Sequence, residues 1–193
     1  GFVNALFGQS YHLFGTNSFA VGDAANTGLN SGLDTDRSDY VARVMYQPDR
    51  IWSFITRFRF DQSTFDVQRF EAEARASFDR WSVSVLYGDY AAQPLLGFLD
   101  RRQGILTNGS IKITQNWVAN AAVRYDIDAE KLAGTSFGVG YIDDCLIVAL
   151  NYMRNYTYSG VATRDDRVML QMTLRTLGGT SVSQTVSSTT GGL

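Results

Sequence analysis

The 193-residue sequence has one cysteine, one histidine and two prolines, and it has no long run of apolar residues. A single cysteine excludes a disulfide framework within the chain, and a single histidine argues against a zinc site or a Cys–His catalytic pair. A membrane-spanning helix needs roughly 18 or more consecutive apolar residues, and polar residues interrupt even the uncharged stretch 1–22. The net charge of -2 gives no argument for nucleic-acid binding.

What the sequence does have is a two-residue alternation of apolar and polar side chains, clearest in residues 168–175, Val-Met-Leu-Gln-Met-Thr-Leu-Arg. Since successive side chains of a strand point to opposite faces, such a segment lies between an apolar and a polar medium. Segments of this kind are close to ten residues long, which suits a tilted strand crossing a bilayer and exceeds the usual strand of a soluble domain. The alternation therefore predicts the wall of a transmembrane β-barrel.

The pattern predicts about ten strands joined by connections that alternate in length. The strands are expected at roughly residues 2–14, 39–47, 51–61, 67–78, 81–90, 105–115, 117–127, 135–143, 145–157 and 167–177. Short turns with longer loops between them are typical of barrels, in which the short turns are periplasmic and the longer loops external. Residues 1–177 are expected to form the barrel portion, and the Gly/Ser/Thr-rich tail 178–193 to be disordered on the periplasmic side.

The two phases of these strands differ in chemistry. One phase carries the aromatic and aliphatic side chains expected to face lipid, for example Trp52, Phe58, Phe70, Trp81 and Trp117. The other carries ten charged side chains expected to line the lumen, because an Arg or Lys facing lipid at the midplane costs about 2–4 kcal/mol. These are Arg43, Arg57, Arg59, Arg69, Glu71, Glu73, Arg75, Lys112, Arg124 and Asp126. The alternative is a soluble β-sandwich with a solvated outer face.

Several stretches, in order along the chain, resemble the C-terminal part of the LptD family of outer-membrane proteins, also called organic-solvent-tolerance proteins. They are Gly-Gln-Ser-Tyr-His-Leu-Phe at 8–14, Ser-Gly-Leu-Asp-Thr-Asp-Arg-Ser-Asp-Tyr at 31–40, Gly-Val-Gly-Tyr-Ile-Asp-Asp-Cys at 138–145, Asn-Tyr at 151–152 and Leu-Arg-Thr-Leu-Gly at 174–178. The resemblance implies an all-β fold, an antiparallel up-and-down transmembrane β-barrel segment that forms an arc of a larger barrel of about 26 strands. A periplasmic β-jellyroll and the first barrel strands would then lie outside this chain, which has no recognisable export signal.

The resemblance also implies a function in the outer membrane of Gram-negative bacteria. The family inserts lipopolysaccharide into the outer leaflet without catalysis and without a cofactor. It receives the lipid from periplasmic bridge proteins, holds the plug lipoprotein LptE in its lumen and releases the lipid sideways between its first and last strands. Strand 167–177 would be one lip of this lateral gate, formed by Val168, Leu170, Gln171, Met172, Leu174 and Arg175.

The single cysteine, Cys145, follows the expected short turn Asp143-Asp144. In the family, cysteines at this turn form disulfides to the periplasmic domain, so the resemblance implies such a bond from Cys145. Here Asp144 occupies a position where the family often has a second cysteine, so at most one bond starts from this turn. An alternative is that Cys145 is a small residue that only packs.

Two other function classes share the alternation. A porin or an autotransporter translocator would have the same strands without the Asp-Asp-Cys turn, and an outer-membrane hydrolase could use a closed barrel of ten strands, since ten is an even number. The sequence offers no motif for catalysis: His12 stands alone and the glycines lack phosphate-loop spacing. Pairing of the first strand with the last would favour these alternatives.

Overall fold

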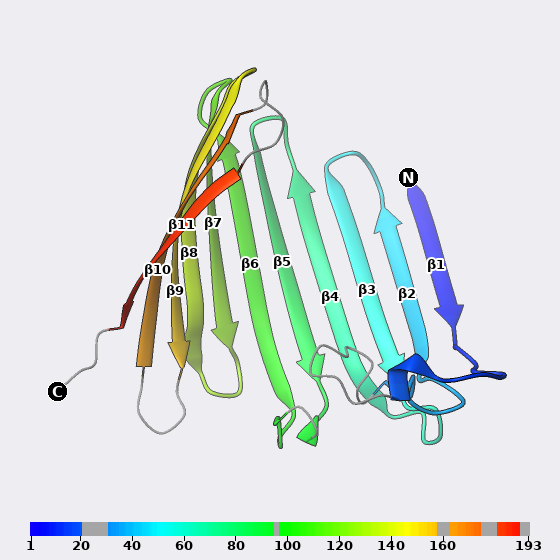
Figure 1. Cartoon of the computed structure of the whole chain (residues 1–193). Helices are drawn as coiled ribbons and strands as arrows, with labels where there is room; N and C mark the ends of the chain where they lie inside the picture. Colours follow the sequence, from blue (N-terminus) through cyan, green and yellow to red (C-terminus); the bar gives the residue numbers. More distant parts are fainter. Residues whose placement is uncertain (21–30, 95–96, 158–162, 175–180, 190–193) are drawn as a thin grey trace. The chain divides into compact units, whose positions relative to one another are not determined.

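The computed structural model describes residues 1–20, 31–94, 97–157, 163–174 and 181–189. The chain divides into two compact units. The first comprises Gly1–Ala74 and Leu86–Gly104, and the second comprises Arg75–Val85 and Ile105–Leu193. The bounds of the two units fall within three strands, which Figure 1 labels β4, β5 and β6.

The described residues form eleven strands. In chain order they are β1 (Phe2–Gly8), β2 (Tyr40–Gln47), β3 (Trp52–Phe60), β4 (Val67–Ser77), β5 (Trp81–Tyr90), β6 (Arg102–Lys112), β7 (Trp117–Asp126), β8 (Lys131–Ile142), β9 (Leu146–Thr157), β10 (Thr163–Leu174) and β11 (Ser181–Thr189). They follow one another in one open sheet in chain order, without a crossover. Neighbouring strands from β1 to β3 and from β7 to β11 pair in antiparallel fashion.

This architecture confirms the all-β, up-and-down class predicted from the alternation, and it suits an arc of a β-barrel. Helix in the described part of the chain is confined to one short 3-10 turn, η1 (Ser18–Ala20). No helix among these residues has the length and apolar character needed to cross a membrane. The strands themselves are long, eight to twelve residues for most of them, as the sequence indicated.

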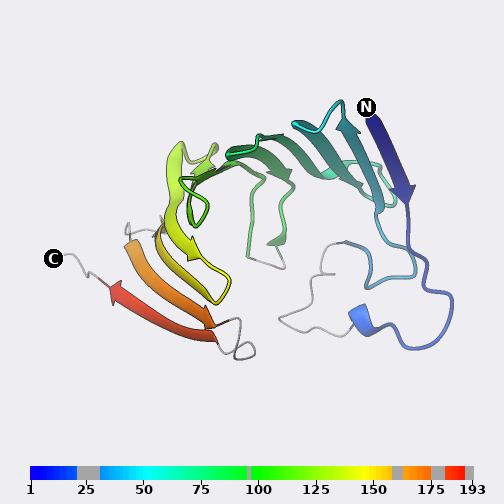
Figure 2. The same ribbon diagram turned by 90° about the horizontal axis from the view of Figure 1, so that it is seen from above.

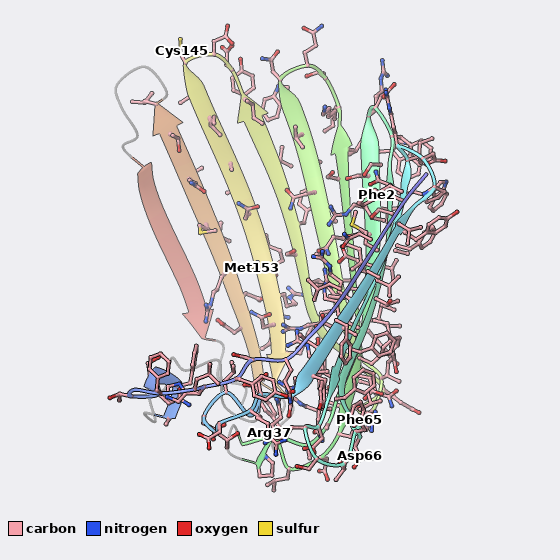
Figure 3. The ribbon with its side chains drawn as sticks, turned by 90° about the vertical axis from the view of Figure 1, so that its right-hand side faces the viewer. Phe2, Arg37, Phe65, Asp66, Cys145 and Met153 are labelled. Carbon is pink, nitrogen blue, oxygen red and sulfur yellow. The ribbon has the colours of Figure 1, made fainter. Side chains whose placement is uncertain are left out.

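In the first unit, the prediction for strand 2–14 was too long. β1 ends at Gly8, and the chain then leaves the strand and returns only at β2. Residues 9–20 and 31–39 extend from the ends of β1 and β2 to one side of these strands (Figure 2). Phe2 lies at one end of this unit, while Phe65 and Asp66 lie in the connection at the other end (Figure 3).

In the second unit, the C-terminal tail departs from the prediction. Ser181–Thr189 forms β11, which pairs with residues 165–173 of β10, so this part of the expected disordered tail is a strand. β10 also pairs with β9 along Thr163–Leu174, and it is therefore not the terminal edge strand that the sequence predicted. The physical reason is that an unpaired strand edge presents a row of N–H and C=O groups, which the backbone of a neighbouring segment can satisfy whatever its side chains.

The sheet has almost no core of its own. Among the described hydrophobic residues only Ala76, at 3% exposure, counts as buried. Large apolar side chains are exposed throughout, including Phe7, Trp81 and Phe137. A soluble domain of this length buries most of its apolar surface, so these faces require a covering medium or a partner.

Candidate functional site

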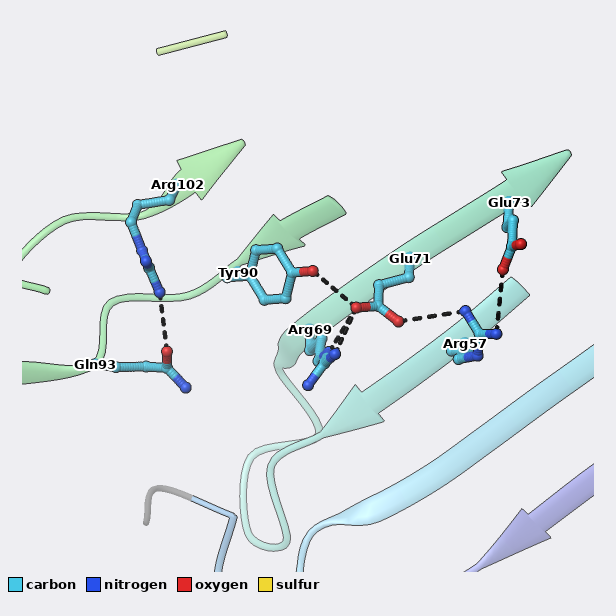
Figure 4. A network of polar contacts seen from close by, with 7 residues as sticks. All are labelled: Arg57, Arg69, Glu71, Glu73, Tyr90, Gln93 and Arg102. Carbon is cyan, nitrogen blue, oxygen red and sulfur yellow. Dashed lines mark hydrogen bonds and ion pairs between the residues drawn. The ribbon is translucent and has the colours of Figure 1, made fainter. Parts of the chain in front are cut away.

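The polar face of the first unit carries a network centred on Glu71, which is only 5% exposed (Figure 4). Its Oε1 accepts hydrogen bonds from the Tyr90 hydroxyl at 2.7 Å and from the Arg69 Nε at 3.1 Å. Its Oε2 lies 3.5 Å from the Arg57 Nη1, and the Arg57 Nη2 reaches the Glu73 Oε2 at 3.3 Å. Four of the predicted lumen residues, on β3 and β4, are thus brought together.

Tyr90, the last residue of β5, links this network to the β5–β6 connection and the start of β6. Its ring lies over Gly88, where an added Cβ would come within 2.6 Å of the ring, so only glycine leaves this space free. The Arg69 guanidinium lies 5.1 Å from the ring centroid, and that of Arg102 lies 5.9 Å away. Arg102 also lies 3.3 Å above the ring of Phe98. Neither Tyr90 nor Arg102 is among the residues to which the alternation assigns a function.

Arg59, another predicted lumen residue, forms an ion pair outside this network. Its Nε lies 3.3 Å from the Asp39 Oδ2, and Asp39 is 5% exposed at the entrance to β2. Burial raises the pKa of Asp39, against the opposing effects of Arg59 and of the Gln62 backbone N–H that donates to it. Arg43, on β2, instead donates from its Nη2 to the Asn4 Oδ1 at 3.0 Å.

Two sequence motifs pack against each other at this entrance. The Gln9 Nε2 and the Ser10 N–H donate to the carbonyl and the hydroxyl of Ser38, both at 2.8 Å. An isolated bridge joins Tyr11 to Arg37. Gly32 has a φ of 70°, and a Cβ there would lie 3.0 Å from the backbone oxygen of Arg37, so this turn requires glycine. The motifs at 8–14 and 31–40 therefore build one folded connection.

The opposite face of the same strands is aromatic. Ring contacts at 4.7 to 6.2 Å run without a break across β1 to β5. The row consists of Phe7, Tyr40, Phe65, Phe60, Phe58, Phe70 and Tyr87. Phe65 joins it from a connection, with a φ of 63° that is unusual for a residue with a large side chain. Arg57 and Glu71 thus lie on one face, and Phe58 and Phe70 on the other, as the alternation predicts for a wall between water and lipid.

The second unit has a hollow of about 380 Å³ on its polar face. Short polar side chains line it, among them Ser82, Ser110 and Asn120, with Arg75 as its predicted charged residue. Gly138 lies under the side-chain oxygens of Asn120 and Asn151, which occupy the space a Cβ would need. The hollow offers hydroxyl and amide groups, which bind sugar hydroxyls or water.

The remaining charged residues of the predicted wall do not join a common cluster. Lys112 lies at the end of β6, and its backbone N–H donates to the Arg80 carbonyl at 2.7 Å. Arg124 lies on β7 across from Gly134, next to a bulge that begins at Tyr125. The Asp126 Oδ1 accepts from the Ala129 N–H at 2.9 Å and so closes the following turn. That all ten charged residues face a lumen stays a prediction.

The predicted gate residues of β10 form a row on one face. Val168, Leu170, Met172 and Leu174 are between 39% and 43% exposed, and Gln171 lies on the other phase of the strand. Arg175 lies outside the described residues. Cys145 is exposed with a free thiol at the tip of the β8–β9 turn, and Met153 lies within β9 (Figure 3). The disulfide from Cys145 to another domain stays a prediction.

Sequence reasoning missed a charged cluster on the apolar phase of β9 and β10, formed by Tyr152, Arg154, Arg164 and Asp166. The sequence contained a sign of this cluster. Arg154 is an even-numbered residue of β9 and shares a face with Leu150, and Asp166 likewise shares a face with Leu170 on β10. The pairing of Asp166 with Arg154 brings the two strands' charges together.

The arrangement of these side chains suits the binding of polar groups more than catalysis. In the part of the chain that the structure describes, no three His, Cys, Asp or Glu side chains gather as a metal site. In the first unit, guanidinium and carboxylate groups held on one face make a hydrated surface that suits polar head groups. In the second unit, the hydroxyl and amide groups of the hollow suit sugars. The aromatic face suits the interface and core of a bilayer.

Comparison with known proteins agrees with this geometry. Residues 1–95 match the family model described as "LptD: LPS transport system D". No curated protein matches the chain. The matched region includes the two interlocked motifs, the Glu71 network and the whole aromatic row. The family consists of outer-membrane transport components and not of enzymes. Through residues 1–95, the chain belongs to the LptD family of lipopolysaccharide transport proteins.

Proposed function

We propose that this chain forms part of the barrel wall of an outer-membrane translocon that inserts lipopolysaccharide into the outer leaflet. The observation that carries the proposal is the opposition of two faces on the same strands. Arg57, Arg69 and Glu71 form a closed polar network on one face, and an unbroken aromatic row covers the other. Such a wall guides a polar sugar portion on its hydrated side while lipid covers its outer side.

In this function the polar face lines the lumen and contacts the plug lipoprotein LptE or the sugars of the passing lipid. Arg57 and Arg69 remain 39% and 46% exposed, so their guanidinium groups stay available to acceptors beyond Glu71. Periplasmic bridge proteins would deliver the lipid from the side of the short turns, where Cys145 lies. No catalysis is required, because the lipid moves without any bond forming or breaking.

The lateral gate would lie at the C-terminal edge of the sheet. Because β11 pairs with β10, the lip consists of β11 with the outward row of β10 beside it. Opening a seam exposes the N–H and C=O groups of an edge strand to lipid, which is tolerated only over a short stretch. Support for this placement comes from the exposed row Val168, Leu170 and Met172.

The test is depletion of the intact protein in living cells. Newly made lipopolysaccharide should fail to reach the cell surface, measured by surface labelling of its sugars, and the wild-type protein should restore it. Normal surface labelling after depletion would contradict the proposal. A porin function would instead appear as a loss of small-solute uptake with lipopolysaccharide export unchanged.

A further inference from the structure

The outward, apolar face of β9 and β10 changes its chemistry at one end. The pairing Leu150↔Leu170 places both side chains on the same face, and Tyr152↔Val168 follows along the strands. The next pair on this face is Arg154↔Asp166. The apolar rows therefore end in charged residues where the two strands approach the connection 158–162, at the end opposite to the turn that bears Cys145.

These charged residues form a compact outer-rim cluster, which we define as Tyr152, Arg154, Arg164 and Asp166. The Asp166 Oδ1 accepts from the Arg154 Nε at 2.8 Å, and its Oδ2 lies 2.7 Å from the Arg164 Nη2. The Arg154 Nη2 also donates to the Tyr152 hydroxyl at 2.6 Å, which in turn donates to Asp166 at 3.1 Å. One carboxylate thus holds two guanidinium groups, which leaves a net charge of +1.

The two arginine side chains of the cluster are more exposed than the carboxylate that holds them. The Asp166 side chain is 15% exposed, while those of Arg154 and Arg164 are 30% and 51% exposed. The carboxylate is therefore sheltered beneath the two cations, and the surface that an approaching ligand meets is positive. Planar guanidinium groups present paired N–H donors that match the oxygens of a phosphate.

The depth of the cluster fits a lipid head group. From Leu174 to Arg164 the strand rises about 33 Å, or about 25 Å along the membrane normal for a tilt of about 40°. The apolar band of an outer-membrane barrel is about 25 Å tall. If Leu174 lies at the inner interface, Arg164 lies at the outer one, where the phosphates of outer-leaflet lipids are found.

We propose that the outer-rim cluster binds the phosphate of a phosphorylated glycolipid as it leaves the translocon, while its acyl chains lie on Leu150, Val168 and Leu170. This inference rests on the proposed function for its membrane orientation and its ligand. Charge complementarity favours a phosphate, and the continuous exposed row beside the cluster favours acyl chains on the same ligand. The cluster would retain lipopolysaccharide at the exit and bias it toward the outer leaflet.

The test uses photo-crosslinking in the intact protein within cells. A benzophenone amino acid replaces Leu170, in the row beside the cluster, and lipopolysaccharide attached to the protein is measured after irradiation. Arg154→Gln with Arg164→Gln should lower this crosslink about tenfold, because both charge-assisted contacts to the phosphate are lost. Enzymatic removal of the lipid A phosphates should lower the crosslink equally in the protein with both arginines.

The matched control is Arg167→Gln. Arg167 is also on β10 and also pairs with a carboxylate, Asp165 at 2.8 Å, but it belongs to the opposite phase of the strand. This variant should leave the crosslink unchanged. If the double variant does not assemble, Arg164→Gln alone is used, because its side chain is the most exposed of the cluster.

The outcomes separate this inference from the proposed function. An equal crosslink in all variants, or no crosslink at Leu170 while surface lipopolysaccharide still depends on the protein, overturns the phosphate site alone. Surface lipopolysaccharide that does not depend on the protein overturns the proposed function. A crosslink to phosphatidylglycerol with the same dependence on the arginines also overturns the proposed site, because the cluster would then bind any anionic lipid.

Discussion

Replacement of Glu71 by Gln is the sharpest perturbation of the polar network. The substitution keeps the size and shape of the side chain but removes the negative charge that three neighbours share. The Tyr90 hydroxyl loses a carboxylate acceptor at 2.7 Å, Arg69 loses its ion pair with Glu71, and Arg57 keeps only its ion pair with Glu73. Since Glu71 is 5% exposed, water replaces little of what is lost.

The magnitude follows from the exposure of each partner. A hydrogen bond to a charged acceptor contributes about 1.5–3 kcal/mol and one to a neutral acceptor about 1 kcal/mol, so the Tyr90 contact weakens by about 1 kcal/mol. The two arginines are 39% and 46% exposed, so each ion pair contributes between about 0 and 1 kcal/mol. We expect Glu71→Gln to lower the free energy of unfolding by about 2 kcal/mol.

The assay is urea-induced unfolding of the intact protein in lipid vesicles, followed by its electrophoretic mobility without boiling. Tyr90→Phe removes only the hydroxyl, and a double-mutant cycle with Glu71→Gln should give a coupling of about 1 kcal/mol. The control is Asp165→Asn, whose ion pair with Arg167 joins side chains 40% and 52% exposed, and it should cost less than about 0.5 kcal/mol. A loss for Glu71→Gln no larger than the control, or full additivity with Tyr90→Phe, would refute the reasoning.

Three further predictions concern other parts of the chain. Gly138→Ala should lower the free energy of unfolding by about 1–2 kcal/mol in the same assay, because two asparagine side chains occupy the space of the new methyl group, whereas Gly140→Ala meets its nearest neighbour at 3.8 Å and should be near neutral. Cys145→Ser should abolish a mobility shift of the intact protein in non-reducing electrophoresis, and free alkylation of Cys145 in cell envelopes would contradict the disulfide. The pKa of Asp61 is held below its usual range by the backbone N–H groups that donate to it. The stabilisation by its carboxylate should therefore be present above pH of about 4 and lost at lower pH, so the melting temperature of wild type should fall more steeply on acidification than that of Asp61→Asn.

The alternation predicted most of the fold, because odd-numbered and even-numbered residues of a strand face opposite sides of the sheet. β5 begins and ends where the pattern predicts, at Trp81 and Tyr90, and β3 differs by one residue at each end. The alternation also placed Arg57 and Glu71 on one face, and a short connection at 61–66 joins their two strands, so the two side chains meet. Local pattern and loop length suffice wherever neighbouring strands pair in sequence order.

The alternation of apolar and polar residues could not predict where the pairing between strands begins and ends. The alternation continues past Gly8, yet the chain there turns away to pair Ser10 with Ser38 and Tyr11 with Arg37, contacts that depend on residues far along the chain. β11 was missed for the opposite reason, since its Ser/Thr-rich composition indicated disorder while an available edge on β10 gave it a partner. Tyr90 was missed because its importance depends on Gly88 and Glu71 together.

The chemistry of the two faces shows what this sheet needs from its surroundings. With Ala76 the one described apolar residue that is buried, the sheet gains little from its own packing. Its polar face is largely satisfied internally, as Glu71 and Asp39 illustrate, so water or a plug can cover that face without supplying missing partners. Its aromatic face has no such internal compensation, and it becomes favourable only against an apolar medium. The charges of Arg154 and Arg164 limit how deep that medium reaches, because a guanidinium facing lipid is costly at the midplane and nearly free of cost at the interface. In the proposed orientation, the position of these two residues would fix the outer boundary of the membrane on β9 and β10, and it would place a cationic surface at the level where an exported lipid exposes its phosphates.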